Sequence, residues 1–452
     1  SLPSVQELNW LGSAPRRTRV AGSEARGIPL AASIVPLLKQ DQPGEAEAIL
    51  DREEGSLGDD VLTQWRQRIA WSYYLSGDDS SARRLAAKAR AGNGDWAAQA
   101  DWVAGLAAWR QDDFEEAANA FAAAARRSGD QEIVAAAHFW SSRANMAAGH
   151  PERVETSLRA AARNPETFYG LLALERLGLK PKPVDQSVLN GVEKRPNVRA
   201  ALALAEIGEM DLADQLIRHQ ARIGDAREHE QLATIAGRMD LPATQLWLAH
   251  NGPAVARASV SARYPNPKGW QPVGGWRVDR SLVFAHALQE SQFRVNVTSP
   301  AGARGLMQVM PGTAAMLSRR RGEPNVGALN NPAINLEYGQ SFMEVVRDMP
   351  ATGGLLPKVI AAYNAGPLPV SEWNAEPRNQ ADPLLYIESI PYWETRSYVT
   401  IILRNYWMYQ LQAGEQTKSL DAMAQGMWPR FPGLSGPTAV RITAPARIAR
   451  AD

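Results

Sequence analysis

Apolar side chains recur at spacings of three and four residues through most of the first 260 positions, which is the pattern of helices with one buried face. From about residue 31 to residue 165 the chain is rich in Ala, Leu, Arg, Glu and Trp, and both Ala and Leu are strong helix formers. Further helices are predicted near residues 198–207, 212–222, 230–238 and 244–250. No segment alternates apolar and polar residues as a long strand does. The pattern therefore predicts a mainly α-helical protein.

A weak internal repeat runs through the first helical region. Three polar turns, SGDD at 76–79, RQDD at 110–113 and AAGH at 147–150, follow one another at intervals of 34 and 37 residues. A period of this length is typical of helix pairs of the tetratricopeptide type. One such pair cannot bury its apolar face alone, so the pairs stack into a superhelix. The repeat predicts an α-superhelical domain over residues 31–164.

Changes in composition divide the rest of the chain. Residues 1–30 are rich in Ser, Gly, Pro and Arg without a steady period, which predicts an extended arm. A second helical stretch over residues 165–263 predicts a helical linker domain. The segment 264–276 holds three Pro and three Gly. We place the last domain boundary there, before a C-terminal domain over residues 270–430 and a tail over residues 431–452.

Tryptophan is concentrated in the repeat region, where six of the 14 lie between residues 65 and 140. Exposed indole rings would offer a stacking surface for a glycan, whereas buried rings would pack between the Ala-rich helices. We favour core packing over a glycan surface.

Charge and composition exclude several classes of protein. Lys and Arg number 49 and Asp and Glu number 48, a formal net charge of +1, which argues against a dedicated nucleic-acid binder. The chain contains no cysteine, so it has no disulfide, thiolate nucleophile or Cys-ligated metal. No apolar run reaches the roughly 18 residues of a membrane span. The chain begins with Ser1, as it would after removal of a signal peptide or after trimming.

The most informative stretch is DRSLVFAHALQESQFRVNVTSPAGARGLMQVM, which begins at Asp279. Asp279 is a good N-cap, and the nearly apolar turns after it predict a buried helix over residues 280–291. Glu290 stands at the end of this helix. An apolar environment raises the pKa of a carboxyl group, as a general acid working near neutral pH requires. Glu290 is therefore a candidate acid, whereas His286 is predicted to be a packed core residue.

The segments after this helix carry features of ligand binding. Three glycines between residues 302 and 312 let a backbone turn tightly, and we interpret them as structural. Gln308 can donate and accept hydrogen bonds, as sugar recognition needs. Farther on, VIAAYNAGP at 359–367 and YIESIPYWETRSYV at 386–399 join apolar runs to polar residues.

Five motifs in the same order closely resemble the catalytic domain of soluble lytic transglycosylases, which are bacterial cell-wall enzymes with a lysozyme-like fold of the goose type. The motifs are QES (289–291), SPAGARGLMQVMPGTA (299–314), NPAINLEYG (331–339), AAYNAGP (361–367) and IESIPYWETRSYV (387–399). The segment NPETFYGLLALERLG, which begins at Asn164, resembles the start of the linker domain of the long soluble members. The resemblance implies a mainly α protein with an α-superhelical repeat domain, a helical linker domain and an α-rich catalytic domain.

The resemblance also implies a chemistry. A single glutamate, Glu290 here, would protonate the oxygen between N-acetylmuramic acid and N-acetylglucosamine. It would then act as a base on the muramic 6-hydroxyl, which closes to a 1,6-anhydro ring. The N-acetyl oxygen of the substrate would stabilise the positive charge, so neither a cofactor nor a metal ion is needed. The residues that match the sugar subsites are Ser299, Gln308, Met310, Tyr363, Asn364 and Glu388, the last as a second carboxylate that binds substrate.

Two other functions stay open at this point. A hydrolysing muramidase on the same fold would need a held water or a second carboxylate, for which Glu388 is the candidate. A helical scaffold whose C-terminal domain only binds glycan would not need Glu290. The lytic transglycosylase interpretation implies peptidoglycan glycan strands as the partner, with other cell-wall enzymes as candidate partners of the helical domain. It places the protein in the periplasm of a Gram-negative bacterium.

Overall fold

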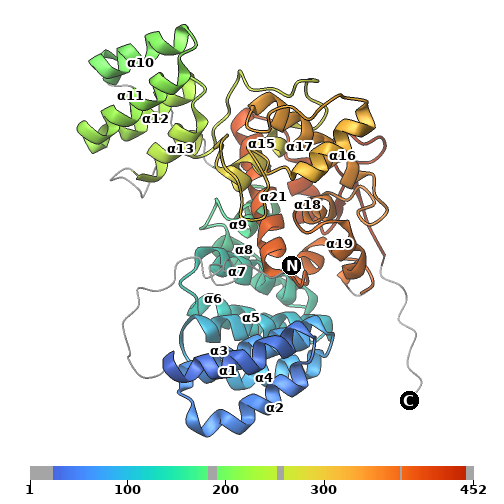
Figure 1. Cartoon of the computed structure of the whole chain (residues 1–452). Helices are drawn as coiled ribbons and strands as arrows, with labels where there is room; N and C mark the ends of the chain where they lie inside the picture. The colour runs from blue at the N-terminus through green and yellow to red at the C-terminus, as the bar shows by residue number, and fades with distance from the viewer. Residues whose placement is uncertain (1–23, 182–190, 252–258, 377–378, 444–452) are drawn as a thin grey trace.

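The computed structural model describes residues 24–181, 191–251, 259–376 and 379–443, and this part of the chain is mainly helical (Figure 1). It contains 22 α-helices, whereas its two paired strands are two residues long each. The prediction of a mainly α protein is confirmed. None of the described helices combines the length and the hydropathy that a membrane span requires.

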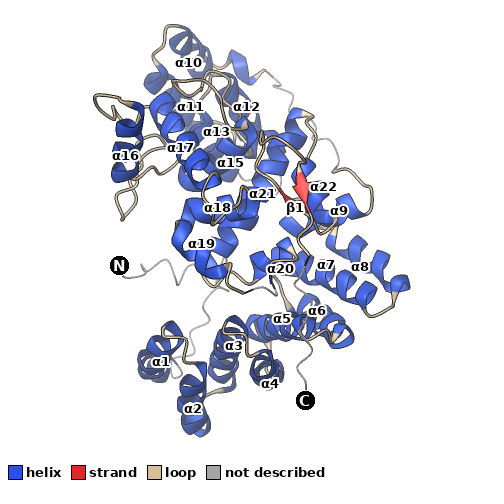
Figure 2. Ribbon diagram, turned by 90° about the vertical axis from the view of Figure 1, so that its right-hand side faces the viewer, coloured by secondary structure: helices blue, strands red, loops and turns tan. Residues whose placement is uncertain are grey.

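The first nine helices form an array in which α3 to α8 each pack on the next helix along the chain (Figures 1 and 2). The pairs α3–α4, α5–α6 and α7–α8 coincide with the repeat that the sequence predicted. We call α1–α9 the array. Its helices are α1 Glu24–Lys39, α2 Pro43–Glu53, α3 Asp59–Leu75, α4 Asp79–Arg90, α5 Gly94–Arg110, α6 Phe114–Arg127, α7 Gln131–Ala147, α8 Val154–Ala161 and α9 Phe168–Arg176.

The polar turns of the repeat end one helix and begin the next. Asp78 and Asp113 are the N-caps of α4 and α6, and each carboxylate accepts a hydrogen bond from the backbone N–H three residues later. Gly77 has a φ of 86° and Asp112 a φ of 60°, so both take the left-handed conformation that reverses the chain. The repeat in the sequence is therefore a repeat of helix caps.

Tryptophans of the array fill its core. Trp65 and Trp140 are 4% and 0% exposed. The ring of Trp140 lies edge-on to Trp102 and Trp109, with centroid separations of 6.4 and 5.4 Å. Core packing is confirmed for these rings, so they do not form a stacking surface for a glycan.

Both ends of the chain differ from the sequence-based expectation. The predicted arm over residues 1–30 is helical where it is described, because α1 begins at Glu24; residues 1–23 lie outside the described residues. The predicted tail over residues 431–452 folds back, since β1 (Trp428–Pro429) pairs antiparallel with β2 (Ala439–Val440). Residues 444–452 lie outside the described residues.

Five helices in the middle of the chain form a small bundle that stands beside the rest of the molecule (Figure 1). They are α10 Pro196–Glu206, α11 Met210–Ile223, α12 His229–Arg238, α13 Pro242–Asn251 and α14 Val260–Arg263. The bundle has a hydrophobic core of its own. Helix α9, which was expected to open the linker domain, packs instead on α7, α8, α21 and α22. The separate bundle thus begins later than the expected residue 165.

The remaining helices form the C-terminal unit, in which α21 packs on α15, α18 and α20. Its helices are α15 Arg280–Ser291, α16 Pro311–Arg321, α17 Pro332–Arg347, α18 Leu356–Ala365, α19 Pro367–Trp373, α20 Pro383–Glu388, α21 Trp393–Ala413 and α22 Lys418–Ala424. Buried apolar side chains of the array and of this unit form one continuous core. For example, Phe168 of α9 stacks on Trp407 of α21 with ring centroids 5.1 Å apart.

Candidate active site

Glu290 lies in the last turn of α15, where the sequence predicted it. The Asp279 carboxylate caps the start of this helix and accepts a hydrogen bond of 2.7 Å from the hydroxyl of Tyr406 in α21. Residues 282–287 are all buried, so the helix is held through its centre. The end of α15 is more open, and Glu290 keeps partial exposure to solvent. The helix therefore presents one carboxyl group at the edge of a rigid core.

The carboxyl group of Glu290 is suited to proton transfer near neutral pH. The hydroxyl of Tyr398 in α21 donates a hydrogen bond of 2.6 Å to Oε1 of Glu290. Burial raises the pKa of Glu290 from 4.5 to about 7, while the hydrogen bond from Tyr398 opposes the rise and the negative charge of Glu394 adds to it. Near neutrality both protonation states are populated, as a group that acts first as acid and then as base requires.

Tyr398 and Glu394 were not predicted as site residues, although both lie in the IESIPYWETRSYV motif. They are four residues apart on α21 and therefore share one face of that helix. That spacing, at the start of a long apolar helix, is the signal that could have drawn attention to them. Sequence separation concealed the contact, since Glu290 and Tyr398 are 108 positions apart in the chain.

Tyr363 of α18 is within reach of the charge of the same carboxyl group. Its hydroxyl donates a hydrogen bond of 2.8 Å to the carbonyl oxygen of Met307. This bond links the AAYNAGP motif to the loop at residues 305–308, which we call the GLMQ loop. Burial and the charge of Glu290 raise the pKa of Tyr363 well above its usual range. The ring of His286 lies edge-on to Tyr363 and Tyr398 at 4.9 and 5.9 Å. His286 is 1% exposed and burial lowers its pKa to about 4, so it is a neutral packing residue, as predicted.

Asn335 of the NPAINLEYG motif holds the GLMQ loop in place. Its Oδ1 accepts a hydrogen bond from the N–H of Met307, and its Nδ2 donates to the carbonyl oxygens of Arg304 and Leu329, all at 2.8 Å. Gly305 has a φ of 73°, and a Cβ there would lie 2.3 Å from the carbonyl oxygen of Leu329. The interpretation of this glycine as structural is confirmed.

Three of the predicted sugar-binding residues lie on this loop or beside it. Nε2 of Gln308 donates a hydrogen bond of 2.8 Å to the carbonyl oxygen of Gly305, and Gln308 itself has a φ of 47°. Oγ of Ser299 accepts a hydrogen bond of 3.0 Å from the N–H of Ala303. Met310 is 43% exposed. Met310 is thus open to a ligand, whereas the polar groups of Ser299 and Gln308 brace the loop.

Asn364, at the end of α18, is exposed and lies against the start of α21. Its Oδ1 accepts a hydrogen bond of 2.7 Å from the hydroxyl of Thr395. Asn364 is therefore adjacent in sequence to Tyr363 and in space to the turn of α21 that carries Glu394.

The structure places Glu388 elsewhere than expected. This carboxylate is 7% exposed and accepts a hydrogen bond from the hydroxyl of Tyr169 in the array. Burial raises the pKa of Glu388, while Arg396 and Tyr169 oppose the rise. Glu388 thus belongs to the contact with the array, and Glu394 is the carboxylate whose charge reaches Glu290. The prediction that Glu388 is a second carboxylate that binds substrate stays a prediction.

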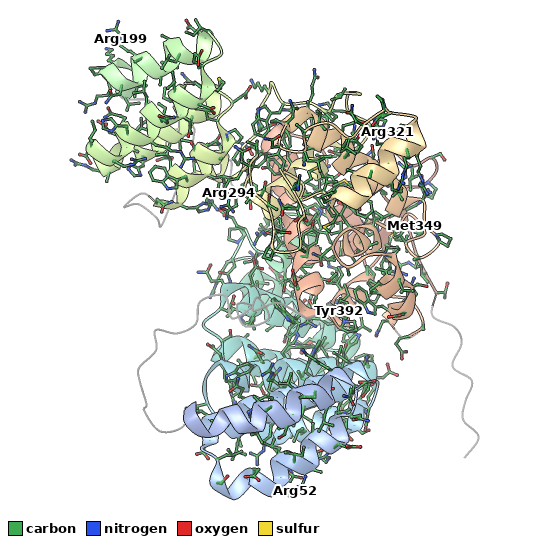
Figure 3. The ribbon with its side chains drawn as sticks, viewed as in Figure 1. Arg52, Arg199, Arg294, Arg321, Met349 and Tyr392 are labelled. Atoms are coloured by element: carbon green, nitrogen blue, oxygen red, sulfur yellow. The ribbon has the colours of Figure 1, made fainter. Side chains whose placement is uncertain are left out.

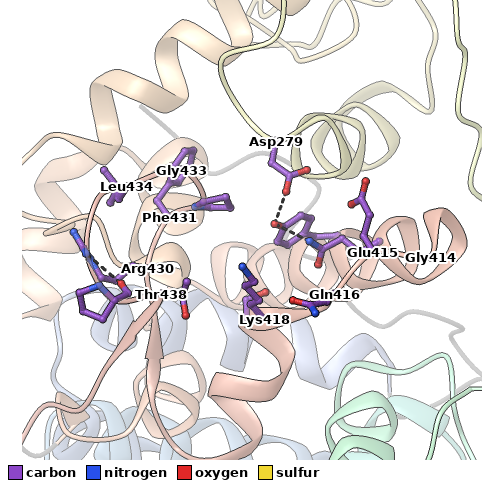
Figure 4. Close-up of a pocket in the computed structure, with 15 residues that line it drawn as sticks. Asp279, Gly414, Glu415, Gln416, Lys418, Arg430, Phe431, Gly433, Leu434 and Thr438 are labelled. Carbon is purple, nitrogen blue, oxygen red and sulfur yellow. Dashed lines mark hydrogen bonds between the residues drawn. The ribbon is translucent and has the colours of Figure 1, made fainter.

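A groove of about 530 Å³ lies between the C-terminal part of α21 and the 428–440 hairpin and contains none of the predicted site residues (Figure 4). Its charged groups include Asp279, which caps α15, and Arg430, whose guanidinium donates hydrogen bonds to the carbonyl oxygens of Ser435 and Pro437. These side chains brace the surrounding structure. The candidate active site is the partly exposed end of α15 that carries Glu290, with the groups of α18 and α21 around it.

The segment that resembles known proteins includes helix α15, which carries Glu290. Residues 273–385 match the family Transglycosylase SLT domain. The soluble lytic murein transglycosylase of Escherichia coli (strain K12) is 34% identical over 155 residues, which cover 34% of this chain and 24% of that protein. The protein of the same name from Salmonella typhimurium is 34% identical over 175 residues, covering 38% and 24%.

Two solved structures extend the likeness to the whole fold. An inactive Glu-to-Gln variant of the lytic transglycosylase Slt from Pseudomonas aeruginosa aligns with a TM-score of 0.64 at 26% identity, covering 89% of this chain and 65% of that one. The 70 kDa soluble lytic transglycosylase from Escherichia coli aligns with a TM-score of 0.59 at 19% identity, covering 90% and 75%. The second likeness shows the fold alone.

Three features together define the class of lysozyme-like SLT domains that follow a superhelical domain. They are a glutamate at the end of a buried helix, a glycine loop held by an asparagine, and a helical array earlier in the chain. Residues 273–385 of this chain match the Transglycosylase SLT domain, and the chain is similar to soluble lytic transglycosylases. Its matching segment spans 24% of the length of the E. coli and Salmonella relatives.

Proposed function

We propose that this protein is a peptidoglycan lytic transglycosylase, a lyase that cleaves the β-1,4 bond between N-acetylmuramic acid and N-acetylglucosamine without consuming water. The observation that carries the proposal is the Glu290 carboxyl group, which is partly exposed at the end of a buried helix and has a pKa of about 7. Relatives named as lytic murein transglycosylases support it, as does the structure of an inactive Glu-to-Gln variant.

In the proposed reaction Glu290 acts twice. As an acid it gives its proton to the bridging oxygen, so the bond from that oxygen to the anomeric carbon breaks and N-acetylglucosamine leaves as an alcohol. The N-acetyl carbonyl oxygen of the muramic residue donates electrons to the anomeric carbon. The muramic 6-hydroxyl then attacks that carbon, the Glu290 carboxylate takes its proton, and a 1,6-anhydro ring forms. Tyr398 stabilises the carboxylate between the two steps by its hydrogen bond.

We assign substrate contacts to the groups around this carboxyl group. Met310 offers an exposed apolar surface, and Asn364 offers an exposed amide beside α21. Tyr363 lies near enough to Glu290 for the charge of that group to act on it. Ser299 and Gln308 complete the proposed set from the loop that they brace.

A hydrolysing muramidase is the second candidate, and Glu394 is the observation that favours it. The charge of Glu394 on α21 acts on Glu290, and an exposed carboxylate in that position could activate water. The two functions differ in their products, since hydrolysis leaves reducing ends and the lyase leaves 1,6-anhydro ends.

Digestion of purified peptidoglycan followed by mass spectrometry tests both candidates. We expect 1,6-anhydro ends from the wild type and a loss of turnover of about 100-fold or more in Glu290→Gln, since the amide cannot carry a proton. Glu372→Gln, an exposed change on α19, is the matched control and should stay active. Reducing ends would favour the muramidase, and wall binding without turnover would favour a glycan-binding scaffold.

This function would place the protein in the periplasm of a Gram-negative bacterium, with peptidoglycan glycan strands as its partner. We propose the array as the superhelical domain, the middle bundle as the linker domain and the C-terminal unit as the catalytic domain. Other cell-wall enzymes are proposed partners of the array.

A further inference from the structure

Two tyrosines of the array reach into the C-terminal unit. The hydroxyl of Tyr169 accepts a hydrogen bond of 3.0 Å from Nε1 of Trp140 and donates one to Glu388. The hydroxyl of Tyr74 shares a hydrogen bond of 2.8 Å with the hydroxyl of Ser389. Tyr169 is 4% and Tyr74 0% exposed. Buried hydroxyl groups need partners, and both find them across this interface.

Arg396, in the first turns of α21, adds a second contact with the array to those made by α20 and the residue after it. Its guanidinium lies 4.3 Å from the ring centroid of Trp71 in α3 and donates a hydrogen bond of 3.1 Å to the carbonyl oxygen of Ile390. The opposite charges of Arg396 and Glu388 attract each other within the interface. Removing the Arg396 charge would take an opposite charge away from the buried Glu388 carboxylate.

Helix geometry turns the two faces of α21 in different directions. Glu394 and Tyr398 are four residues apart and face Glu290, whereas Arg396, midway between them, is rotated by about 200° from Glu394 and faces the array. Figure 3 shows Tyr392, the N-cap residue of α21, on the side of the C-terminal unit that meets the array. The start of α21 is thus held between the array and the catalytic carboxyl group.

We propose that the array positions the active site, with Tyr169 as a positioning residue that holds Glu388 and Arg396 and thereby fixes the turns of α21 that present Tyr398 to Glu290. The inference rests on the proposed function. Tyr169 is 4% exposed and its hydroxyl is bonded to Glu388, so its proposed effect on Glu290 is indirect.

Loosening the start of α21 would change the proton affinity of Glu290. The groups that surround it are Tyr398 and Glu394 on α21, Tyr363 on α18 and neutral His286 on its own helix. Burial is the largest cause of the raised pKa, so admitting water lowers the pKa from about 7 toward 4.5. The acid form is then lost at lower pH, and the descending limb of the pH–rate profile moves to lower pH.

The test is Tyr169→Phe in the full chain, assayed on soluble glycan strands across pH. We expect kcat at neutral pH to fall severalfold with KM little changed, and the descending limb to move down by about half a unit or more. Tyr73→Phe is the matched control, because the Tyr73 hydroxyl donates its 2.9 Å hydrogen bond to Glu47 inside the array. It should leave the limb in place. Arg396→Lys, which keeps the charge but not the planar contact with Trp71, should move the limb in the direction of Tyr169→Phe.

A wild-type pH profile in Tyr169→Phe and Arg396→Lys, with only a lower Tm, would overturn the positioning role. Titration of the Glu290 carboxyl by ¹³C NMR, identified by its absence in Glu290→Gln, separates this failure from failure of the proposed function. If the wild type cleaved no peptidoglycan but Tyr169→Phe still lowered the pKa of Glu290, the proposed function would fall and the positioning would stand. If the wild type cleaved peptidoglycan but Tyr169→Phe left the pKa of Glu290 unchanged, the positioning role would fall and the proposed function would stand.

Discussion

The proposed catalytic role of Glu290 has a cost in stability. The pKa of Glu290 is about 7 in the folded protein and near 4.5 without burial. Because the folded value is the higher one, the stability linked to this proton is fully present below about pH 4.5 and is lost as the pH rises through about 7. With a neutral amide at position 290, the free energy of unfolding has no such dependence on pH.

We therefore expect Glu290→Gln to be more stable than the wild type at alkaline pH. The gain in the free energy of unfolding should grow from near pH 4.5 to near pH 8, by about 1–3 kcal/mol. Urea unfolding at both pH values measures it, with the exposed Glu372→Gln as the control. A stability difference that is independent of pH would contradict the raised pKa.

Tyr398→Phe should raise the pKa of Glu290, whereas Tyr169→Phe should lower it. The hydroxyl of Tyr398 donates to the Glu290 carboxylate and lowers the pKa of that group. Without this bond the pKa of Glu290 rises, so the descending limb of the pH–rate profile moves to higher pH. Tyr386→Phe is the control, because the buried Tyr386 hydroxyl has no hydrogen-bond partner among the described residues. A limb that moves to lower pH would show that Tyr398 chiefly excludes water.

The properties of an individual residue could be predicted from the sequence where neighbouring residues in the chain determine them. The apolar turns before Glu290 determine its burial, so its raised pKa could be predicted from neighbours in the sequence. The choice between Glu388 and Glu394 could not, because it depends on which face of the chain meets the array and which meets α15. Both carboxylates lie in one motif, and only the folded contacts with Tyr169 and Glu290 separate them.

At the scale of elements, the helices of the array could be predicted because caps and periodicity are local signals. The turns at Asp78 and Asp113 are visible in the sequence as SGDD and RQDD. The GLMQ loop is different, since a residue from α17 supplies its hydrogen bonds. That dependence was not evident from the sequence.

Asn335→Ala should therefore destabilise the loop and reduce turnover together. The change leaves one N–H and two carbonyl groups without their partner in a site where Asn335 is 0% exposed. We expect a loss of about 2–4 kcal/mol in the free energy of unfolding. Asn330→Ala, at an exposed position in the preceding turn, should change it by less than about 0.5 kcal/mol. Equal effects of the two changes would mean that the loop does not depend on Asn335.

At the scale of the whole molecule, the domain boundary predicted from composition does not coincide with a boundary of the hydrophobic core. Residues 270–430 were expected to form a separable catalytic domain, because a segment rich in Pro and Gly precedes them. The buried apolar side chains nevertheless run without interruption from the array into the C-terminal unit. Composition marks where the chain is irregular, whereas separability depends on which surfaces become exposed on cutting.

We expect the fragment 265–452 to fold poorly on its own. Cutting at residue 265 would expose Trp407, which is 0% exposed in the whole chain, and would leave the Glu388–Arg396 pair without Tyr169. Exposed aromatic surface and an unsupported buried charge pair both favour aggregation or a lower Tm. Near-UV circular dichroism and thermal unfolding of the fragment measure this, and coexpression with residues 24–181 should restore a soluble complex because that piece supplies the missing surface. A fragment that alone shows the Tm and the aromatic signals of the intact unit would mean that the shared core adds little, and the array would then be a platform attached to an independent enzyme.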